Sequence, residues 1–322
     1  MQEEYGPKTR FAQEQHAQKY RGKGESFKEG CTRQANALAD NSDHFEAYRD
    51  ALLNQRFLPG GRIQSAAGSP RKATCYNCVV SGTIEDSMQS ILEKAAEAGI
   101  SMKYGAGIGY DFSTIRPKND KIRTIDSSAS GAVSFMHIFD AVCKTVASAG
   151  NRRGAQMGVL RVDHPDIEEF IEAKRNQDSL TQFNISVAVT DEFMRAVEKG
   201  KDFDLVFDGR VYETVNARHL FEKIMRINWD WAEPGVLFID RINDMNNLYF
   251  CEQIAATNPC GEQPLPPYGA CLLGSFNLTK YIVGKESNAQ AFLHSFDWEQ
   301  FKTDIPVAVS YTHLTLPTNR EV

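Results

Sequence analysis

Predicted strands alternate with predicted helices along residues 163–240, and this alternation limits the fold more than any other feature of the sequence. The segment FNISVAV, residues 183–189, has apolar side chains at every second position, which predicts a strand. Thr190 then offers the side-chain oxygen that an N-cap requires, and Gly200 is the residue type that commonly ends a helix. A strand followed at once by a helix is typical of an α/β architecture.

Other signals extend this pattern on both sides. Apolar and polar residues alternate on either side of Asp208-Gly209, a dipeptide that favours a hairpin turn. Residues 217–231 predict an amphipathic helix, and residues 235–240 predict a short buried strand. Upstream, residues 163–176 predict a helix with Asp163 as its N-cap. The whole region therefore predicts the α/β fold class.

The first part of the chain, residues 1–74, is polar and is predicted to be helical. One amphipathic helix is predicted over residues 46–57, ahead of the helix breaker Pro59-Gly60-Gly61. The apolar side chains of residues 88–102 fall on one face of another predicted helix. The glycine-rich segment at residues 104–110 lacks the spacing of a dinucleotide-binding fingerprint and predicts a tight backbone turn.

The composition argues against several classes of protein. The chain has 322 residues, of which 42% are hydrophobic and 24% are charged, as is ordinary for a globular protein. No segment approaches the roughly 20 apolar residues of a membrane-spanning helix, and the N-terminus lacks the apolar core of a signal peptide. The net charge of −6 gives no support for a nucleic-acid surface. We therefore expect a cytoplasmic protein that binds neither membranes nor nucleic acid.

The sequence contains seven cysteines, an odd number that favours a reducing compartment and argues against structural disulfides. Cys75 and Cys78 form a CxxC motif, which is compatible with a thioredoxin-like redox pair or with half of a zinc site. A zinc site needs two more ligands, and Cys260 and Cys271 do not have zinc-finger spacing. A thioredoxin motif would open a helix, whereas an extended segment follows Cys78. Neither reading is favoured, and no metal site is expected.

The segment Asn258-Pro-Cys260-Gly-Glu262 places a thiol two residues from both an amide and a carboxylate. Nearby prolines and a glycine exclude a regular helix, so we expect a shaped loop. If that loop is extended, Asn258, Cys260 and Glu262 lie on one side of it. They would then offer a sulfur reactant, a base and a hydrogen-bonding group. A surface turn with a chance cysteine is the alternative that spacing alone leaves open.

Several short motifs occur in order along the chain: Phe57-Leu-Pro-Gly-Gly-Arg62, Tyr76-Asn-Cys78, Glu85-Asp-Ser-Met88, Gly107-Ile-Gly109, Phe112-Ser-Thr-Ile-Arg116, Arg152-Arg-Gly-Ala-Gln-Met157, His164-Pro-Asp-Ile167, Asn258-Pro-Cys-Gly-Glu262 and Ala270-Cys271. Each motif is weak by itself. Together, and in this order, they make the chain resemble the large, catalytic subunit of ribonucleotide reductase from about residue 10 to about residue 295.

The resemblance implies an N-terminal helical domain over residues 1–74 and, over residues 75–308, the first part of a ten-stranded α/β barrel with a central finger loop. Residues 309–322 need a separate account. Val309 and Tyr311 alternate as in a strand, yet this peptide resembles the translation of a transposase-type sequencing adapter. We expect the tail to be non-native. The rest of the barrel, the substrate-phosphate loop and a C-terminal cysteine pair would then be missing, and the chain alone would not turn over.

Catalytic roles follow from the resemblance, residue by residue. Cys260 matches the residue that becomes a thiyl radical and takes a hydrogen atom from C3′ of a ribonucleotide. Glu262 matches the carboxylate that accepts the 3′-hydroxyl proton, and Asn258 matches the amide that hydrogen-bonds the ribose. Cys78 and Cys271 match the pair that supplies two electrons and ends as a disulfide. Their α-carbons should then lie less than ~7 Å apart.

The resemblance also implies a specificity site for a deoxynucleoside triphosphate or ATP, which selects the substrate base. The residues expected to touch the effector's base and sugar are Asp86, Ser87 and Met88, and the residue expected to meet its phosphates is Arg116. A loop that links this site to the active site is expected to contain Arg152, Arg153 and Gln156. The alternative for Asp86 is an ordinary charge at a helix N-terminus, and for the two loop arginines it is a solvated surface.

The family contains enzymes with different radical sources, and the NPCGEQPLP segment looks more like the kind that uses adenosylcobalamin. A large subunit served by a separate metal-containing radical subunit is the alternative. The implied partners are a ribonucleoside di- or triphosphate substrate, a reductant of the thioredoxin or glutaredoxin type, and a second copy of the chain in a homodimer. Two rival functions remain open at this point. One is an inactive nucleotide-binding fragment, and the other is a thiol–disulfide oxidoreductase that uses Cys75 and Cys78.

Overall fold

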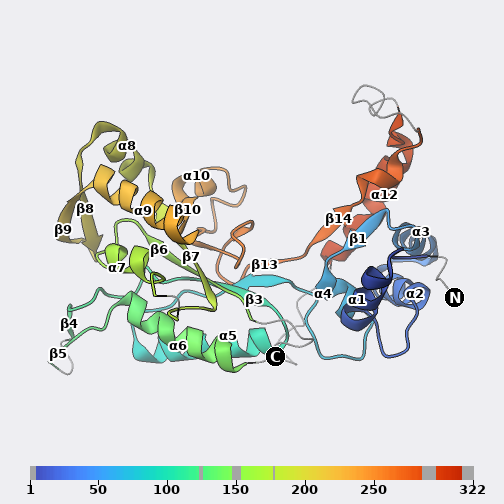
Figure 1. Cartoon of the computed structure of the whole chain (residues 1–322), viewed down its shortest axis with the longest axis horizontal. Helices are drawn as coiled ribbons and strands as arrows, with labels where there is room; N and C mark the ends of the chain where they lie inside the picture. Colours follow the sequence, from blue (N-terminus) through green and yellow to red (C-terminus); the bar gives the residue numbers. More distant parts are fainter. Residues whose placement is uncertain (1–4, 123–125, 147–153, 177, 285–294, 314–322) are drawn as a thin grey trace. The chain divides into compact units, whose positions relative to one another are not determined.

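The computed structural model in Figure 1 describes residues 5–122, 126–146, 154–176, 178–284 and 295–313. The chain divides into two compact units. One unit, which we call the helical unit, comprises Met1–Asn77 together with Leu272–Val322. The other, the barrel unit, comprises Cys78–Cys271 and contains the predicted catalytic residues.

The helical unit combines helices with one two-stranded sheet. Strand β1 pairs antiparallel with β14, so that Phe57 lies opposite Phe276. This pairing joins residues beyond 271 to the N-terminal segment, whereas the sequence analysis placed them with the barrel in residues 75–308. The elements of the helical unit are α1 (Arg10–Tyr20), α2 (Phe27–Leu38), α3 (Ser42–Leu53), β1 (Phe57–Pro59), α4 (Gly61–Ala66), β14 (Gly274–Phe276), η1 (Leu278–Tyr281), α12 (Trp298–Ala308) and η2 (Val309–His313).

Two local predictions in this unit are wrong. The helix predicted over residues 46–57 ends at Leu53, and Phe57 lies in β1 with only 1% of its surface exposed. The strand pattern at Val309 and Tyr311 is also wrong, because these residues form the short 3₁₀ helix η2. The Tyr311 ring lies 5.4 Å from the Phe57 ring, so the two segments pack against each other although they are distant in sequence.

The barrel unit is a mixed α/β structure built on one main sheet. Its elements are β2 (Cys78–Val80), α5 (Met88–Lys103), β3 (Gly107–Asp111), β4 (Lys121–Ile122), β5 (Ser127–Ser128), α6 (Ala132–Thr145), β6 (Gln156–Arg161), α7 (Ile167–Glu172), β7 (Phe183–Val189), α8 (Asp191–Lys199), β8 (Asp202–Phe207), β9 (Arg210–Asn216), α9 (Ala217–Trp231), β10 (Gly235–Phe238), α10 (Ile239–Asp244), β11 (Ala256–Thr257), β12 (Pro264–Leu265) and β13 (Ala270–Cys271).

The main sheet has six strands in the order β10-β7-β6-β3-β2-β13. The pairs formed among β2, β3, β6, β7 and β10 are parallel, and β13 is antiparallel to β2. Parallel neighbours need long crossover connections, and these connections contain the helices. Helices α5 and α6 lie side by side in Figure 1. The sheet curls as expected for the first part of an α/β barrel, so the predicted fold class is confirmed.

The two faces of the sheet have different neighbours, because successive side chains of a strand point to opposite faces. On one face, Ile108, Tyr110 and Val187 belong to the large apolar core formed with the helices. On the other face, which we call the inner face, Val80 and Val159 pack with a smaller cluster that includes residues from the 254–265 region. The segment with the predicted radical cysteine therefore lies on the inner face.

Local predictions with clear end signals are confirmed. Strand β7 covers the predicted residues, and the Thr190 hydroxyl accepts a hydrogen bond from the Phe193 amide at 3.1 Å at the start of α8. Gly200 ends α8 in the left-handed conformation. Asp208 and Gly209 form the turn of the β8–β9 hairpin, with φ angles of 49° and 70°. Helix α9 has the predicted bounds.

Other local predictions are wrong, because the position or contacts of these residues in the fold differ from what the local sequence pattern suggests. Helix α7 begins at Ile167 with Asp166 as its preceding residue, because the Asp163 carboxylate instead pairs with Arg161 at 2.6 Å. Strand β10 is half-buried rather than buried, because it forms the edge of the sheet. Met88, which the sequence placed on the apolar face of α5, is 56% exposed.

Candidate active site

Two glycines of β3 make room for the loop that contains Cys260. A β-carbon at Gly109 would collide with the backbone carbonyl of Thr257. A β-carbon at Gly107 would lie 2.8 Å from Pro259 Cγ and 3.4 Å from the Cys78 sulfur. The predicted tight turn is present at the start of the glycine-rich segment, where Tyr104 and Gly105 form a turn after α5 and Gly105 has a φ of 100°. Gly107 and Gly109 instead lie in β3, over which the loop packs closely, and the sequence did not predict this use of them.

The loop itself is a closed turn. The Asn258 amide donates to the Gln263 carbonyl at 3.1 Å, and the Gln263 amide donates to the Asn258 side-chain oxygen at 3.0 Å. The Gly261 amide donates to the Asn258 carbonyl at 3.0 Å, and Gly261 has a φ of 80°. These bonds fold the segment back on itself, so it is not the extended loop in which alternate side chains share one side.

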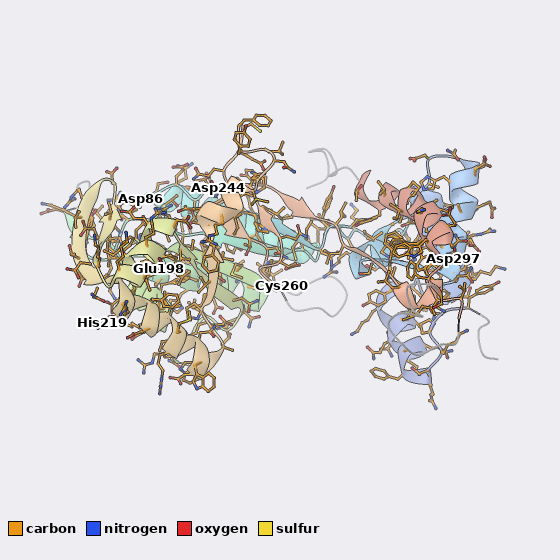
Figure 2. All side chains as sticks on the ribbon, turned by 90° about the horizontal axis from the view of Figure 1, so that it is seen from above. Asp86, Glu198, His219, Asp244, Cys260 and Asp297 are labelled. Carbon is orange, nitrogen blue, oxygen red and sulfur yellow. The ribbon has the colours of Figure 1, made fainter. Side chains whose placement is uncertain are left out.

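Within this turn the three candidate side chains differ in exposure. Asn258 is completely buried, and its side-chain nitrogen has no hydrogen-bond partner among the described residues. Cys260 and Glu262 are exposed. Figure 2 shows Cys260 well apart from Asp86 within the barrel unit. The loop thus presents a thiol and a carboxylate outward above a buried amide that has a free donor.

Cys78 and Cys271 lie directly opposite one another where β13 pairs with β2. Directly opposed residues of an antiparallel pair have α-carbons about 4.5–5.5 Å apart, which is within disulfide reach. Both residues are buried, with 5% and 4% of their surfaces exposed. A hydrogen bond from Cys78, together with burial and the nearby charge of Glu262, raises the pKa of the Cys271 thiol well above its ordinary value. Both cysteines are reduced in this structure.

The other cysteine of the CxxC motif is Cys75. It belongs to the helical unit, where it is half-buried against the apolar core of that unit. Burial raises the pKa of its thiol. No group of three or more potential metal ligands occurs among the described residues. Within the barrel unit, the directly opposed strand partner of Cys78 is Cys271.

The predicted effector residues Asp86 and Arg116 are brought together. The Arg116 Nε donates to the Asp86 carboxylate at 2.7 Å, and the Arg116 amide donates to the same carboxylate at 3.1 Å. Ser87 is the N-cap of α5 and accepts a hydrogen bond from the Ser90 amide at 3.2 Å. Met88 follows it and is exposed. The N-terminus of α5 therefore combines an ion pair with an exposed apolar side chain. A ligand could contact both the charged groups and the apolar surface there.

The predicted linking loop is only partly described. Arg152 and Arg153 lie outside the described residues. Gln156 is the first residue of β6 and is completely buried, with its side-chain oxygen accepting a hydrogen bond from the Tyr110 hydroxyl at 2.9 Å. Arg116 follows the opposite end of the neighbouring parallel strand β3. The structure therefore does not bring Gln156 to the Asp86–Arg116 pair.

Asn184 is a site residue that the sequence analysis missed. Its side-chain nitrogen donates to the Pro259 carbonyl at 2.7 Å, so it holds the residue next to Cys260 against the inner face of β7. Asn184 and Ser186 occupy the polar positions of the alternating segment FNISVAV, so the sequence pattern gave no signal that set Asn184 apart. Asn184 contributes to the rigid support that a reactive side chain needs.

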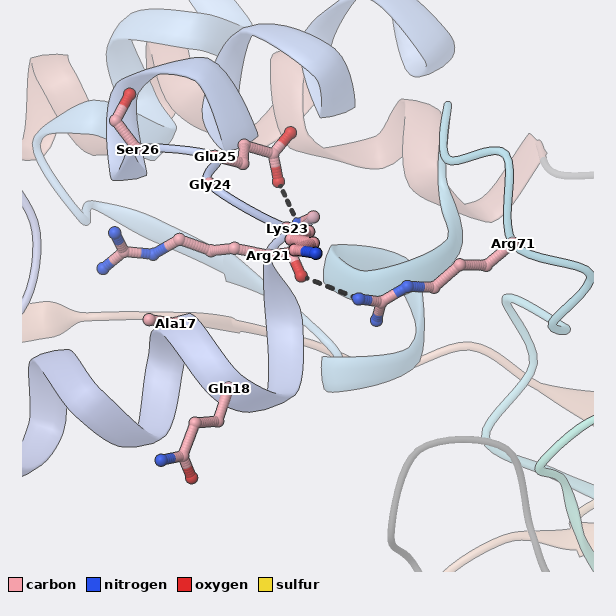
Figure 3. Close-up of a pocket in the computed structure, with 9 residues that line it drawn as sticks. Ala17, Gln18, Arg21, Lys23, Gly24, Glu25, Ser26 and Arg71 are labelled. Carbon is pink, nitrogen blue, oxygen red and sulfur yellow. Dashed lines mark hydrogen bonds between the residues drawn. The ribbon is translucent and has the colours of Figure 1, made fainter.

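A cavity of about 480 Å³ lies in the helical unit (Figure 3). Arg21, Lys23 and Arg71 contribute to its lining, and Arg71 donates to the Arg21 carbonyl at 3.1 Å. Glu25 also lines it and accepts a hydrogen bond from the Gly22 amide at 2.7 Å. None of the predicted site residues lines this cavity. The candidate site is accordingly the loop and thiol pair of the barrel unit.

Comparison with known proteins identifies close relatives for most of the chain. The family model described as "Ribonucleotide reductase, barrel domain" matches residues 76–317. A vitamin B12-dependent ribonucleoside-diphosphate reductase of Thermoplasma acidophilum is 38% identical over 74% of this chain and 31% of the relative. A protein of the same name from Mycobacterium tuberculosis is 35% identical over 92% of this chain and 43% of the relative.

A vitamin B12-dependent ribonucleotide reductase of Streptomyces clavuligerus is 34% identical over 92% of this chain and 32% of its own length. The chain thus spans between 31% and 43% of the length of these relatives. The family match extends to residue 317 and so includes most of the tail that the sequence analysis treated as non-native. Among the described residues, no helix is both long and apolar enough to cross a membrane.

Proposed function

Because this chain belongs to the ribonucleotide reductase family, whose barrel domain it matches, we propose that the protein reduces ribonucleotides to deoxyribonucleotides by thiyl-radical chemistry. One observation carries the proposal. Cys78, whose directly opposed partner is Cys271, lies beside the loop that contains Cys260, because Gly107 leaves room for both the Cys78 sulfur and Pro259 of the loop. A radical residue, a base and a dithiol must converge on one ribose for this reaction.

The proposed chemistry assigns a separate step to each side chain. The Cys260 thiyl radical takes the hydrogen atom from C3′, and the Glu262 carboxylate accepts the 3′-hydroxyl proton. The bond between C2′ and its oxygen then breaks, and the oxygen leaves as water with a proton from one thiol. Cys78 and Cys271 supply the two electrons, the hydrogen of the second thiol ends on C2′, and the two sulfurs end joined by an S–S bond. Glu262 returns its proton to the 3′-oxygen, and Cys260 returns its hydrogen atom to C3′ and is again a thiyl radical.

Two features of the site support these roles. The raised pKa of Cys271 keeps that thiol protonated, and a protonated thiol can serve as the acid for a poor leaving group. The unpartnered side-chain nitrogen of Asn258 can donate a hydrogen bond to a ribose oxygen without losing another partner. A buried donor without a partner is costly, so a ligand that satisfies it gains affinity.

The names of the relatives lead us to propose adenosylcobalamin as the cofactor. When bound, it would supply the radical chemistry that protein side chains cannot generate alone. The exposed thiol of Cys260 suits this role, because a buried sulfur could not be reached from outside the loop. This chain's own contribution is to hold that thiol in a fixed position through Asn184 and the loop hydrogen bonds.

We propose further that a deoxynucleoside triphosphate or ATP binds at Asp86, Ser87, Met88 and Arg116. Arg152, Arg153 and Gln156 would belong to the segment that transmits effector binding to the active site.

We also propose that the protein forms a homodimer. Helix α5 leaves Met88, Leu92 and Ile100 between 42% and 56% exposed, and an apolar helix face of this kind suits a second copy. A thioredoxin- or glutaredoxin-type protein would re-reduce the Cys78–Cys271 disulfide after each turnover.

The test uses the full-length gene from which these residues come, with reduction of a ribonucleoside di- or triphosphate measured in the presence of adenosylcobalamin. Cys260→Ser should lower the rate by at least about a thousandfold, because no other step can begin. Cys75→Ser, the matched control, should keep the parent rate. Equal loss in both variants would instead favour an oxidoreductase that uses Cys75 and Cys78. Activity that needs a separate metal-containing subunit in place of adenosylcobalamin would reassign the radical source.

A further inference from the structure

Tyr268 lies three residues before Cys271 and has a φ of 62°. Left-handed backbone is rare for bulky residues and persists only where neighbouring contacts hold it. Two backbone hydrogen bonds do so here. The Tyr268 amide donates to the Val80 carbonyl at 3.0 Å, and the Val80 amide donates to the Gly269 carbonyl at 2.8 Å. These bonds continue the β2–β13 pairing past the two opposed cysteines.

The Tyr268 side chain is contacted on two sides, although 62% of the residue is exposed. Lys94 of α5 donates to the tyrosine hydroxyl at 2.5 Å, and its nitrogen lies 5.0 Å from the ring centroid. On the other side the ring lies against Gly82, where an added β-carbon would come within 2.6 Å of the ring and its hydroxyl. Lys94 is itself mostly buried and pairs with Glu97 at 3.0 Å. The cation therefore has a fixed position from which to hold the ring.

We propose that Tyr268 is a positioning residue that keeps the Cys271 strand in register with β2, with Lys94 as its clamp. The inference rests on the proposed function, since it concerns the thiol pair of that site. Register matters because side chains alternate between the two faces of a sheet. A slip of one residue would turn the Cys271 sulfur away from Cys78. Strand β13 has only two residues, so its own ladder is a weak constraint on register.

Oxidation by oxidised glutathione reports directly on this pairing. Cys78 and Cys271 lose two protons and two electrons and form one S–S bond. The S–S bond of glutathione breaks, and two glutathione thiols leave. The reaction needs neither substrate nor radical, so it measures the geometry of the pair separately from ribonucleotide reduction. Its rate and its equilibrium constant can be followed by mass spectrometry of the Cys78–Cys271 disulfide.

Two variants each remove one partner of the contact between Tyr268 and Lys94. Tyr268→Gly removes the ring and tolerates the left-handed backbone, and Lys94→Met removes the cation. Each should lower the rate and the equilibrium constant of disulfide formation by about tenfold, because small misplacements of reacting groups are costly. Lys94→Arg keeps a cation at this position and should give the same rate and equilibrium constant as the parent. Lys103→Met, an exposed lysine on the same helix, should leave them unchanged.

Thermal unfolding of each variant shows whether it is folded, and if Tyr268→Gly fails to fold, Lys94→Met against Lys103→Met decides. If Lys94→Met is folded and forms the disulfide with the parent rate and equilibrium constant, the clamp is refuted and the proposed function is untouched. If the parent chain itself never forms the Cys78–Cys271 disulfide, the clamp and the dithiol of the proposed function are both refuted. The two failures are therefore distinguishable.

Discussion

The lack of a side chain at Gly109 allows the Cys260 loop to pack against β3. The backbone of the Cys260 loop crosses β3 at this residue, and a β-carbon would meet the Thr257 carbonyl. The sequence predicts a turn at this glycine, because turns are where glycines are most often required. The actual requirement comes from a segment far downstream. No local pattern could have revealed it, since the partner is fixed only by the tertiary structure.

We expect Gly109→Ala to destabilise the barrel unit by about 1–3 kcal/mol, because the added methyl forces the loop backbone to move. The free energy of unfolding can be measured by urea denaturation. Gly209→Asn is the matched control, since Gly209 has no atom within 4 Å of its added β-carbon and asparagine tolerates its left-handed backbone. An alanine variant as stable as the parent would contradict the close packing of loop and strand.

His164 is a buried histidine with a structural role, 2% exposed. Its Nδ1 accepts a hydrogen bond from the Asp166 amide at 3.0 Å, and its Nε2 donates to the Ile115 carbonyl at 2.9 Å. This arrangement requires the neutral ring. Burial lowers the pKa of His164 below its ordinary value of 6.5, although the Ile115 hydrogen bond opposes the shift.

The consequence for stability follows from proton linkage. The folded protein binds fewer protons at His164 than the unfolded chain, so this contribution is complete above pH 6.5 and is lost as the pH falls below it. The free energy of unfolding should therefore decrease between pH 7.5 and pH 5.5, and His164→Asn should make that decrease smaller. His219→Gln, at an exposed histidine of α9, should leave it unchanged. The same decrease in all three proteins would exclude His164 as its source.

At the scale of elements, the bounds of a helix could be predicted from the sequence where both of its ends have capping residues. Helix α8 has a capping threonine at one end and a left-handed glycine at the other, and its bounds are as predicted. Helix α7 was misplaced because Asp163 is engaged by Arg161, although an aspartate is a common N-cap. Asn184 was missed for a similar reason. Its partner, the Pro259 carbonyl, is distant in sequence.

Helix α12 is joined to the segment before β1 by a buried ion pair. Arg56 Nε lies 2.6 Å from the Asp304 carboxylate, which is 4% exposed and also accepts a hydrogen bond from the Tyr281 hydroxyl. Arg56 also pairs with Asp50 at 2.8 Å, so its charge keeps one partner when the Asp304 charge is removed. We expect Asp304→Asn to destabilise the helical unit by about 1.5–3 kcal/mol, the range for a lost hydrogen bond to a charged group, measured by urea denaturation.

The matched control lies on the same helix. Glu299 pairs with Lys302 at 3.1 Å, but the two side chains are 88% and 65% exposed. Exposed pairs contribute little, so Glu299→Gln should change the free energy of unfolding by less than about 1 kcal/mol. Equal effects of the two substitutions would mean that the Arg56–Asp304 pair does not hold α12 in place.

At the scale of the whole molecule, the sequence predicted the α/β class and, through resemblance, the barrel. It did not predict that residues beyond 271 return to the helical unit. That return depends on pairing between β1 and β14, two strands of three residues each. Strands this short have little signal of their own, and their partner lies at the other end of the chain. The pairing of Cys78 with Cys271 likewise came from resemblance, because spacing alone suggested Cys75.

The proposed reaction leaves a covalent record in the protein that can be read after a single turnover. The full-length reduced enzyme would be mixed with a ribonucleotide and adenosylcobalamin, without a reductant, and its cysteines mapped by mass spectrometry. We predict one Cys78–Cys271 disulfide for each deoxyribonucleotide formed, and neither product in Cys260→Ser. Deoxyribonucleotide formation without that disulfide, or with a disulfide between Cys75 and Cys78, would contradict the assignment of the site.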